Sequence, residues 1–266
     1  MPDWQDSKKA LLVSAFLFWS LLTGYAIGAV EPSTACDSTQ FDEVAVVDTV
    51  YDGDTIRLRD KRIVRFIGIN TPELSRQFVP AQPFAAEAKQ ALQKLLPAGT
   101  EVGLRFDEDR LDHYKRTLAH IYSKSGQNLS AVLLQQGLAF AIVVPPNTSI
   151  IGCYFANEQQ ARQAKQGLWS SPAYLPKQIN TLKKEDTGFH YVEGRVTHIG
   201  KSKKNVWLDM GDAFSVRIQQ QHLHYFSAMP IDTLKDKQIR VRGWVAFYNG
   251  KLRINIGHPA MIEIVN

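Results

Sequence analysis

The alternation of hydrophobic and polar residues predicts several short strands in the first half of the chain. In EVAVVDTV, for example, apolar and polar side chains alternate over part of the segment, as in a strand with one buried face. We expect five strands before residue 123, joined by short turns such as Asp60-Lys61. These strands are predicted at residues 43–50, 55–58, 62–69, 100–106 and 117–122.

Three further segments in this half are typical of helices. Residues 83–96 begin with a proline, carry apolar side chains on one face and are followed by Pro-Ala-Gly. Residues 129–136 follow Asn128, which is suited to cap a helix, and a third helix is expected at residues 154–166. Strands first and helices later predict an α+β fold, built on an antiparallel five-stranded sheet that closes into a barrel.

The second half of the chain has a different pattern. Residues 171–188 contain prolines and charges without a clear period, which indicates a linker. Asn249-Gly250 lies between two apolar runs and is a strong hairpin signal. The spacing predicts a second five-stranded barrel of the OB type over residues 189–266. Its strands are expected at residues 191–200, 205–210, 213–218, 238–248 and 252–256.

The N-terminal segment is apolar along its whole length. Lys8 and Lys9 precede an uncharged run over residues 10–30. This pattern indicates either a signal peptide or a membrane anchor within residues 1–35, and in both cases the rest of the chain leaves the cytoplasm. We therefore expect a periplasmic or secreted protein, or one anchored in the inner membrane through an uncleaved segment.

The charge and the cysteine content of the chain indicate its kind of partner and the state of its cysteines. The chain has 266 residues, with 31 lysines and arginines against 26 aspartates and glutamates, and the net charge of +5 suits a polyanionic partner. Cys36 and Cys153 are its two cysteines. In an exported protein this even count predicts a disulfide, and two cysteines are too few for a thiolate zinc site.

Polar residues interrupt the apolar strands of the first barrel at four places. They are Asp52 and Asp54 on either side of a glycine, Arg65 within a strand, NTPE at residues 70–73, and DHYKR at residues 112–116. Each motif alone is compatible with a turn or a surface strand. Together they supply oxygen ligands for Ca²⁺, arginines for phosphate oxygens and a carboxylate for water, which are the groups needed to hydrolyse a phosphodiester.

The ordered motifs strongly resemble the staphylococcal nuclease family. The resemblance covers residues 43–169 and rests on DGDTIRL, VRFIGINTPE, DHYKRTLAHIY, LLQQGLA, PPN and EQQARQAKQGLW. It implies an OB-type barrel with three helices over residues 36–170, followed here by the second OB-like barrel. It also implies Ca²⁺-dependent cleavage of DNA and RNA that leaves 3′-phosphates.

The resemblance assigns a metal-binding role to four residues. Asp54 corresponds to a direct calcium ligand and Asp52 to an outer ligand acting through water. Thr71 corresponds to a residue that offers its backbone carbonyl. Asn70 stands where the staphylococcal enzyme has an aspartate, so this chain would hold the metal with one negative charge fewer.

The same resemblance assigns the chemistry to five other residues. Glu73 corresponds to the general base acting on the attacking water. Arg65 and Arg116 correspond to the arginines that hold the scissile phosphate, with Arg116 nearer the leaving 5′-oxygen. Tyr114 matches a tyrosine near the phosphate, and His113 replaces a lysine there. The family's substrate-stacking tyrosines are missing, because this chain has AIVVPPN at residues 141–147.

The second barrel carries aromatic residues and arginines that suit single-stranded nucleic acid, although the same residues are compatible with an ordinary core and rim. His222 and His224 are expected at the surface. The candidates for binding are Trp207, Trp244, Phe247, Tyr248, Arg217, Arg240, Arg242 and Arg253.

The sequence predicts a monomeric, exported, Ca²⁺-dependent endonuclease acting on DNA and RNA, with single strands favoured. The alternative is a nuclease fold that only binds nucleic acid, in which Asn70 marks a disabled site. Retention of Glu73, Arg65 and Arg116 favours the enzyme.

Overall fold

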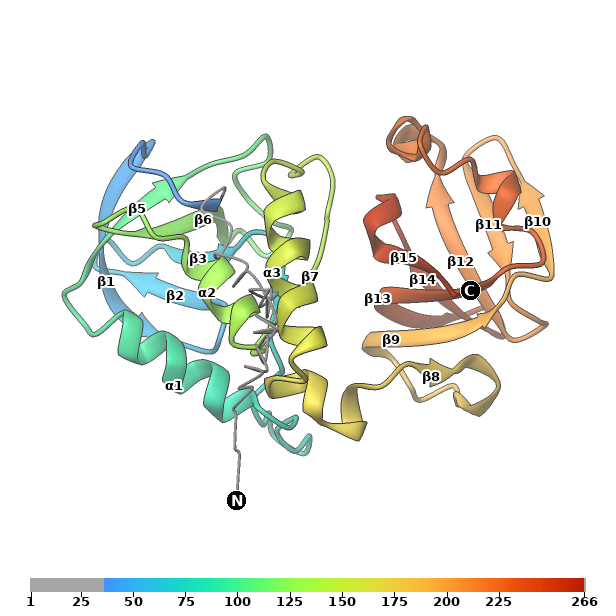
Figure 1. Cartoon of the computed structure of the whole chain (residues 1–266), viewed down its shortest axis with the longest axis horizontal. Coiled ribbons are helices and arrows are strands. Elements are labelled where there is room, and N and C mark those ends of the chain that lie inside the picture. The colour runs from blue at the N-terminus through green and yellow to red at the C-terminus, as the bar shows by residue number, and fades with distance from the viewer. Residues whose placement is uncertain (1–35, 266) are drawn as a thin grey trace, which may run out of the picture. The chain divides into compact units, whose positions relative to one another are not determined.

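Five strands of the first half close into a barrel (Figure 1). Strand β1 pairs with β2 on one side and with β5 on the other, which closes the sheet. A computed structural model of the chain describes residues 36–265, and the predicted export segment lies outside them. In spatial order the strands are β1 (Glu43–Val50), β2 (Thr55–Leu58), β3 (Ile63–Phe66), β6 (Thr117–Ser123) and β5 (Glu101–Arg105).

One pairing differs from the antiparallel sheet that the sequence predicted. Strand β6 lies between β3 and β5, antiparallel to β5 but parallel to β3. The connection from β3 to β5 contains a helix, so β5 and β6 return as a hairpin whose second strand fills the gap beside β3. This parallel pair places the start of β6 next to β3, which matters for the site described below.

The predicted strand at residues 62–69 is divided by a turn. Strand β3 ends at Phe66, and Gly68 has a φ of 84°, in the left-handed region that favours glycine. A Cβ at Gly68 would lie 2.2 Å from the ring of Tyr154, so a larger residue does not fit. The chain then forms a separate short strand, β4 (Ile69–Asn70), which pairs with β7 (Phe140–Ala141).

Three helices accompany the barrel, as predicted. They are α1 (Ala85–Leu95), α2 (Leu129–Gln135) and α3 (Ile151–Gln163). The Asn128 side chain caps α2 by accepting a hydrogen bond from the backbone N–H of Ala131 at 3.0 Å. Helix α3 begins three residues earlier than expected, and Cys153 on its first turn is bonded to Cys36. The predicted disulfide is therefore present, with its two Cα atoms 5.6 Å apart.

The second half forms a sheet with the strand order of the first barrel. Strand β9 pairs with β13, and strand β10, just after it, pairs with β11, so one continuous stretch of chain reaches both sides of the sheet. Strands β12 and β14 form the parallel pair that corresponds to β3 and β6. The strands are β9 (Gly188–Arg195), β10 (His198–Lys201), β11 (Asn205–Asp209), β12 (Phe214–Gln219), β13 (Gln238–Tyr248) and β14 (Lys251–Asn255).

Details of this sheet confirm one local prediction and add elements that the pattern did not reveal. Asn249 and Gly250 have φ values of 49° and 78°, as a two-residue hairpin turn requires. Two short strands were not predicted: β8 (Lys177–Gln178) pairs with β9, and β15 (Ile262–Val265) pairs with β13. Strand β8 lies within the predicted linker at residues 171–188, and the domain boundaries stay predictions.

The two β-structures share buried residues within one compact unit of the chain. Phe140, Ile142 and Val143 belong to the same apolar cluster as the core of the second sheet. The backbone N–H of Val143 also donates to the sulfur of Met261 at 3.2 Å. Within residues 36–265, no helix is long and apolar enough to cross a membrane.

Candidate active site

Asp54 lies in the turn between β1 and β2 and is almost fully buried, with 5% of its surface exposed. Its Oδ2 accepts hydrogen bonds from the backbone N–H of Thr71 at 2.8 Å and from the Thr71 hydroxyl at 3.0 Å. The preceding Gly53 allows this approach, because a Cβ there would lie 2.8 Å from the Thr71 side chain and 2.7 Å from Ala88. The turn and the start of the loop after β4 are therefore held together through Asp54.

Arg65 is the positive partner of Asp54. Strand pairing sets Arg65 opposite Thr55, which brings its guanidinium to the neighbouring Asp54. Its Nη2 lies 3.0 Å from Asp54 Oδ2 and donates to Asn70 Oδ1 at 3.1 Å. Its Nη1 donates to the carbonyl of Phe66 at 2.9 Å. The structure thus gathers Asp54, Arg65, Asn70 and Thr71, four of the predicted residues, into one buried cluster.

Asp52 supports this cluster from the same turn. Its Oδ1 accepts the backbone N–H of Asp54 at 3.0 Å. Burial of Asp52, and after it the nearby charge of Asp54, raise the pKa of the Asp52 carboxyl to about 6. The turn therefore concentrates negative charge that a cation would stabilise.

Glu73 lies two residues beyond the cluster but is not joined to it. Its carboxylate is about half exposed and forms an ion pair with Arg76, at 2.6 Å from Glu73 Oε2 to Nη2. Its backbone is held by Gln82: the N–H of Glu73 donates to Gln82 Oε1 at 2.9 Å, and the N–H of Gln82 donates to the carbonyl of Glu73 at 2.9 Å. The backbone of the predicted base is thus held by Gln82, and its side chain is paired with Arg76.

Arg116 stands immediately before β6, beside the strand that carries Arg65. The parallel pairing of Val64 with Thr117 brings these neighbouring strands together. Asp112 orients Arg116: its Oδ2 accepts from Arg116 Nε at 2.7 Å, and its Oδ1 accepts from the backbone N–H of Arg116 at 2.9 Å. Burial alone would raise the pKa of the Asp112 carboxyl. The contacts with Arg116 outweigh this effect and hold that pKa below its usual range.

Tyr114 and His113 form the exposed side of the same loop. Tyr114 is 70% exposed, and the guanidinium of Arg116 lies 5.4 Å from the centre of its ring. The rings of His113 and Tyr114 are 3.8 Å apart. Both residues lie beside Arg116, as predicted, and neither belongs to the buried cluster around Asp54.

Three residues near the site were not assigned roles from the sequence. Asp112 orients Arg116, Arg76 pairs with Glu73, and Gln82 holds the Glu73 backbone. The spacing of four residues between Asp112 and Arg116 was a usable signal. The contact of Gln82 with Glu73 spans nine positions through an irregular loop, and no pattern in the sequence indicates it.

The oxygen atoms of the cluster fit a hard divalent cation. The carboxylate of Asp54 and the amide oxygen of Asn70 lie together, Thr71 is hydrogen-bonded to Asp54, and Asp52 adds negative charge nearby. Among the described residues, no group of three or more His, Cys, Asp or Glu side chains is arranged to hold a metal. A cation here would therefore depend on amide and carbonyl oxygens, and Arg65 would have to release the oxygens of Asp54 and Asn70.

Comparison with known proteins identifies relatives of the first barrel. The family model described as staphylococcal nuclease homologue matches residues 63–171. Endonuclease YncB of Bacillus subtilis (strain 168) is 35% identical over 134 residues, which cover 48% of this chain and 63% of YncB. The SPbeta prophage-derived endonuclease YokF of the same organism is also 35% identical over 134 residues, and 45% of its length is covered.

A thermonuclease is matched over a larger share of its length. The thermonuclease of Staphylococcus intermedius is 32% identical over 131 residues, covering 48% of this chain and 76% of the thermonuclease. In contrast, the match spans less than two thirds of YncB and YokF. The region shared with all three relatives is about half of this chain.

Proposed function

The chain belongs to the staphylococcal nuclease family, and from this premise we propose that it is an exported endonuclease that uses Ca²⁺ to hydrolyse phosphodiester bonds in DNA and RNA. The proposal rests mainly on one observation: the buried guanidinium of Arg65 lies 3.0 Å from Asp54 and donates to Asn70, and Asp54 also accepts hydrogen bonds from Thr71. Names of relatives such as endonuclease and thermonuclease support the class of reaction.

Two of the oxygens that would hold the metal, those of Asp54 and Asn70, are now in contact with Arg65. Asp54 would be a direct ligand, Asn70 would give its amide oxygen and Thr71 its carbonyl, with Asp52 acting through water. When bound, Ca²⁺ would supply positive charge next to the phosphate that accepts the water. Arg65 would then turn its donors from Asp54 and Asn70 to the phosphate oxygens, since a guanidinium fits them in pairs.

Glu73 and Arg116 complete the proposed mechanism. Glu73 takes a proton from the attacking water, which requires its carboxylate to leave Arg76. Arg116, oriented by Asp112, neutralises the charge that develops on the phosphoryl oxygens as the 5′-oxygen leaves. The products would carry 3′-phosphates, and Tyr114 and His113 would contact the substrate beside Arg116.

The location outside the cytoplasm is part of the proposal. The Cys36–Cys153 disulfide supports it, because such bonds form in oxidising compartments. The protein would be periplasmic, secreted, or held at the inner membrane by an uncleaved N-terminal segment, and it would act as a monomer.

Substitution of the base and of one arginine tests the catalytic roles. We expect Glu73→Gln and Arg116→Ala each to lower kcat/KM on single-stranded DNA by about a hundredfold or more. Glu108→Gln is a matched control, because Glu108 is an exposed glutamate that lies outside the cluster. Losses of less than tenfold in the first two variants would contradict the assigned roles.

The contact between Glu73 and Arg76 supports one alternative, a nuclease fold that binds nucleic acid without cleaving it. In that case the chain would show salt-sensitive binding and no turnover with any divalent metal. Turnover that depends on Glu73 would exclude this alternative.

A further inference from the structure

The net positive charge of the chain resides in its C-terminal part. Residues 189–266 contain eleven lysines and arginines against six aspartates and glutamates, whereas the two classes are equal in number before residue 189. The excess therefore belongs to the second sheet and not to the nuclease barrel. A basic surface of this kind attracts polyanions.

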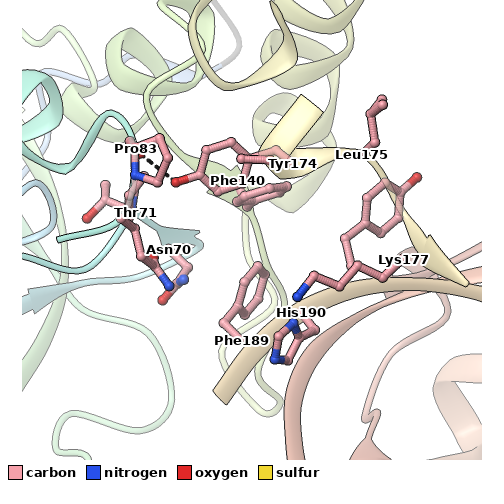
Figure 2. A pocket seen from close by; sticks show the side chains of 13 residues that line it. Asn70, Thr71, Pro83, Phe140, Tyr174, Leu175, Lys177, Phe189 and His190 are labelled. Atoms are coloured by element: carbon pink, nitrogen blue, oxygen red, sulfur yellow. Dashed lines mark hydrogen bonds between the residues drawn. The ribbon is translucent and has the colours of Figure 1, made fainter. Parts of the chain in front are cut away.

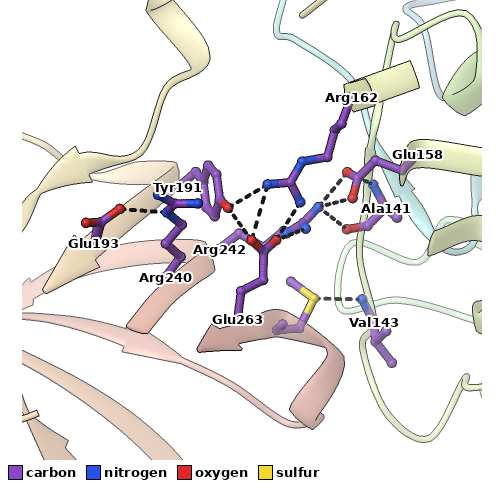
Figure 3. A network of polar contacts seen from close by, with 10 residues as sticks. Ala141, Val143, Glu158, Arg162, Tyr191, Glu193, Arg240, Arg242 and Glu263 are labelled. Carbon is purple, nitrogen blue, oxygen red and sulfur yellow. Dashed lines mark hydrogen bonds and ion pairs between the residues drawn. The ribbon is translucent and has the colours of Figure 1, made fainter. Parts of the chain in front are cut away.

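Two of the arginines in this sheet have a structural role. Arg242 is 1% exposed; its Nη1 lies 2.6 Å from Glu158 Oε2 on α3, and its Nη2 lies 2.7 Å from Glu263 Oε1 (Figure 3). Arg240 is paired with Glu193 at 2.6 Å. Both had been candidates for nucleic-acid binding, and the structure instead uses Arg242 to join the second sheet to α3.

Two other arginines lie beside aromatic rings on the outer face of the sheet. The guanidinium of Arg253 is 4.9 Å from the centre of the Trp207 ring and 4.8 Å from that of Tyr248. Arg217 lies 5.9 Å from Trp207 and donates from Nε to Asn205 at 2.8 Å. These residues come from β11, β12, β13 and β14, whose alternate side chains face outward.

These two arginines are not neutralised by carboxylates. Within residues 36–265, neither Arg217 nor Arg253 takes part in an ion pair, and the buried Nε of Arg253 has no hydrogen-bond partner. Their donors and the aromatic faces beside them suit a ligand that offers both phosphates and flat rings.

The same outer face continues toward the candidate active site. Trp244, on β13, is 44% exposed and packs against Phe189 with ring centres 5.2 Å apart. Phe189 lines a pocket of about 140 Å³ together with Tyr174, Lys177 and His190 (Figure 2). On the other side, the pocket is lined by Asn70, Thr71 and Pro83. The pocket therefore lies between the aromatic face and two residues of the buried cluster, Asn70 and Thr71.

We propose that this pocket and the outer face of β13, β14, β12 and β11 form one binding track for a single strand of nucleic acid. Its bases stack on Trp244, Tyr248 and Trp207, and its phosphates meet Arg253 and Arg217. A single strand is the ligand that fits, because its bases are free to stack on side chains, whereas those of a duplex are stacked on one another. The track takes the place of the stacking tyrosines missing from residues 141–147.

Binding of a single strand to the track does not depend on the proposed function. Only one part of the proposal does, namely that the bound strand is a substrate and leads from the track to the catalytic cluster. The test is therefore a binding measurement without turnover. Fluorescein-labelled oligothymidylate of fifteen nucleotides is titrated with the protein lacking the predicted export segment (residues 36–266) in EDTA, and fluorescence anisotropy is followed at several salt concentrations. The variants are Arg217→Gln/Arg253→Gln, Trp244→Ala, and a control, Lys94→Gln/Lys237→Gln, which removes the same charge elsewhere. Thermal unfolding confirms that each variant is folded.

The double substitution Arg217→Gln/Arg253→Gln should weaken binding of the oligonucleotide at least tenfold. It should also reduce the salt dependence of the affinity, because two phosphate contacts are lost. Trp244→Ala should weaken binding at least fivefold. The control variant should bind the oligonucleotide with an affinity within twofold of that of the parent protein. The proposed track would be wrong if the double arginine variant bound as tightly as the parent protein. It would also be wrong if the control variant lost as much affinity as the double arginine variant. Tighter binding of a fifteen-base-pair duplex would overturn its assignment to single strands.

Cleavage assays separate this proposal from the catalytic one. The arginine pair should raise KM for a twenty-nucleotide substrate while leaving kcat/KM for a trinucleotide within twofold. If the protein cleaves nothing yet its binding depends on Arg217 and Arg253, the track stands and the proposed enzyme fails. If cleavage depends on Glu73 but long and short substrates respond equally to the arginine variants, the enzyme stands and the track fails.

Discussion

The guanidinium of Arg65 lies 3.0 Å from the carboxylate of Asp54, and both side chains are buried. The proposed metal ligand and the proposed phosphate ligand therefore neutralise each other in this structure. Binding of a cation and a phosphate would exchange this contact for two new ones, without leaving either charge unpaired.

Removal of Asp54 should destabilise the fold as well as the activity. Asp54→Ala leaves the buried charge of Arg65 without its carboxylate, which we expect to cost about 3 kcal/mol in the free energy of unfolding. Urea unfolding measures this loss. Asp54→Ala/Arg65→Ala should recover part of it, because no charge remains unpaired. A loss below about 1 kcal/mol in the single variant would contradict the pairing.

Asn70→Asp should strengthen metal binding. The substitution adds a negative charge at an oxygen that already faces the cluster, where it accepts a hydrogen bond from Arg65. We expect the Ca²⁺ concentration for half-maximal cleavage to fall about tenfold, since charge count tunes calcium affinity. Isothermal titration of Ca²⁺ provides a second measurement that does not depend on turnover. An unchanged or weaker affinity would show that Asn70 is not a ligand.

Asp112 is expected to act as a positioning residue for Arg116. Asp112→Asn keeps the shape of the side chain but removes the charge that holds Arg116 Nε at 2.7 Å. We expect kcat to fall about tenfold with little change in KM, because misplacement of Arg116 affects the transition state more than binding. Asp109→Asn, at an exposed aspartate of the same loop, serves as the control. A loss confined to KM would assign Asp112 to substrate binding.

The motifs predicted which residues gather around Asp54, because Arg65 lies within a strand of the first barrel and Asp54 and Asn70 lie close to the ends of such strands. Asp54, Arg65 and Asn70 reach one another through the adjacent pairings of β2 with β3 and the turn at Gly68. The contact of Glu73 with Arg76 was not predicted, because it depends on an irregular loop. The burial of Arg242 also escaped the pattern: in its strand an arginine looks the same whether it faces solvent or α3.

Acid should weaken the contact between the second sheet and α3. Burial alone would raise the pKa of Glu263, but bonds with Arg162 and Tyr191 and the charge of Arg242 lower it from 4.5 to about 2. A carboxyl whose pKa is lowered by folding stabilises the fold fully at a pH above its pKa in the unfolded chain. This contribution is lost as the pH falls from about 4.5 toward 2. Thermal unfolding should therefore show a steeper decrease with acid in the parent than in Glu263→Gln. Glu101→Gln, at an exposed pair with Lys124, should retain the parent slope, and equal slopes in all three proteins would contradict the prediction.

We propose that the cluster around Asp54 cleaves phosphodiesters with the help of Ca²⁺. It is tested most directly by incubating residues 36–266 with single-stranded DNA in Ca²⁺, in other divalent metals and in chelator, with analysis of the product ends. We expect fragments with 3′-phosphates in Ca²⁺, no cleavage in chelator, and loss of cleavage in Glu73→Gln. Intact DNA in every metal, or cleavage that persists in chelator, would contradict it.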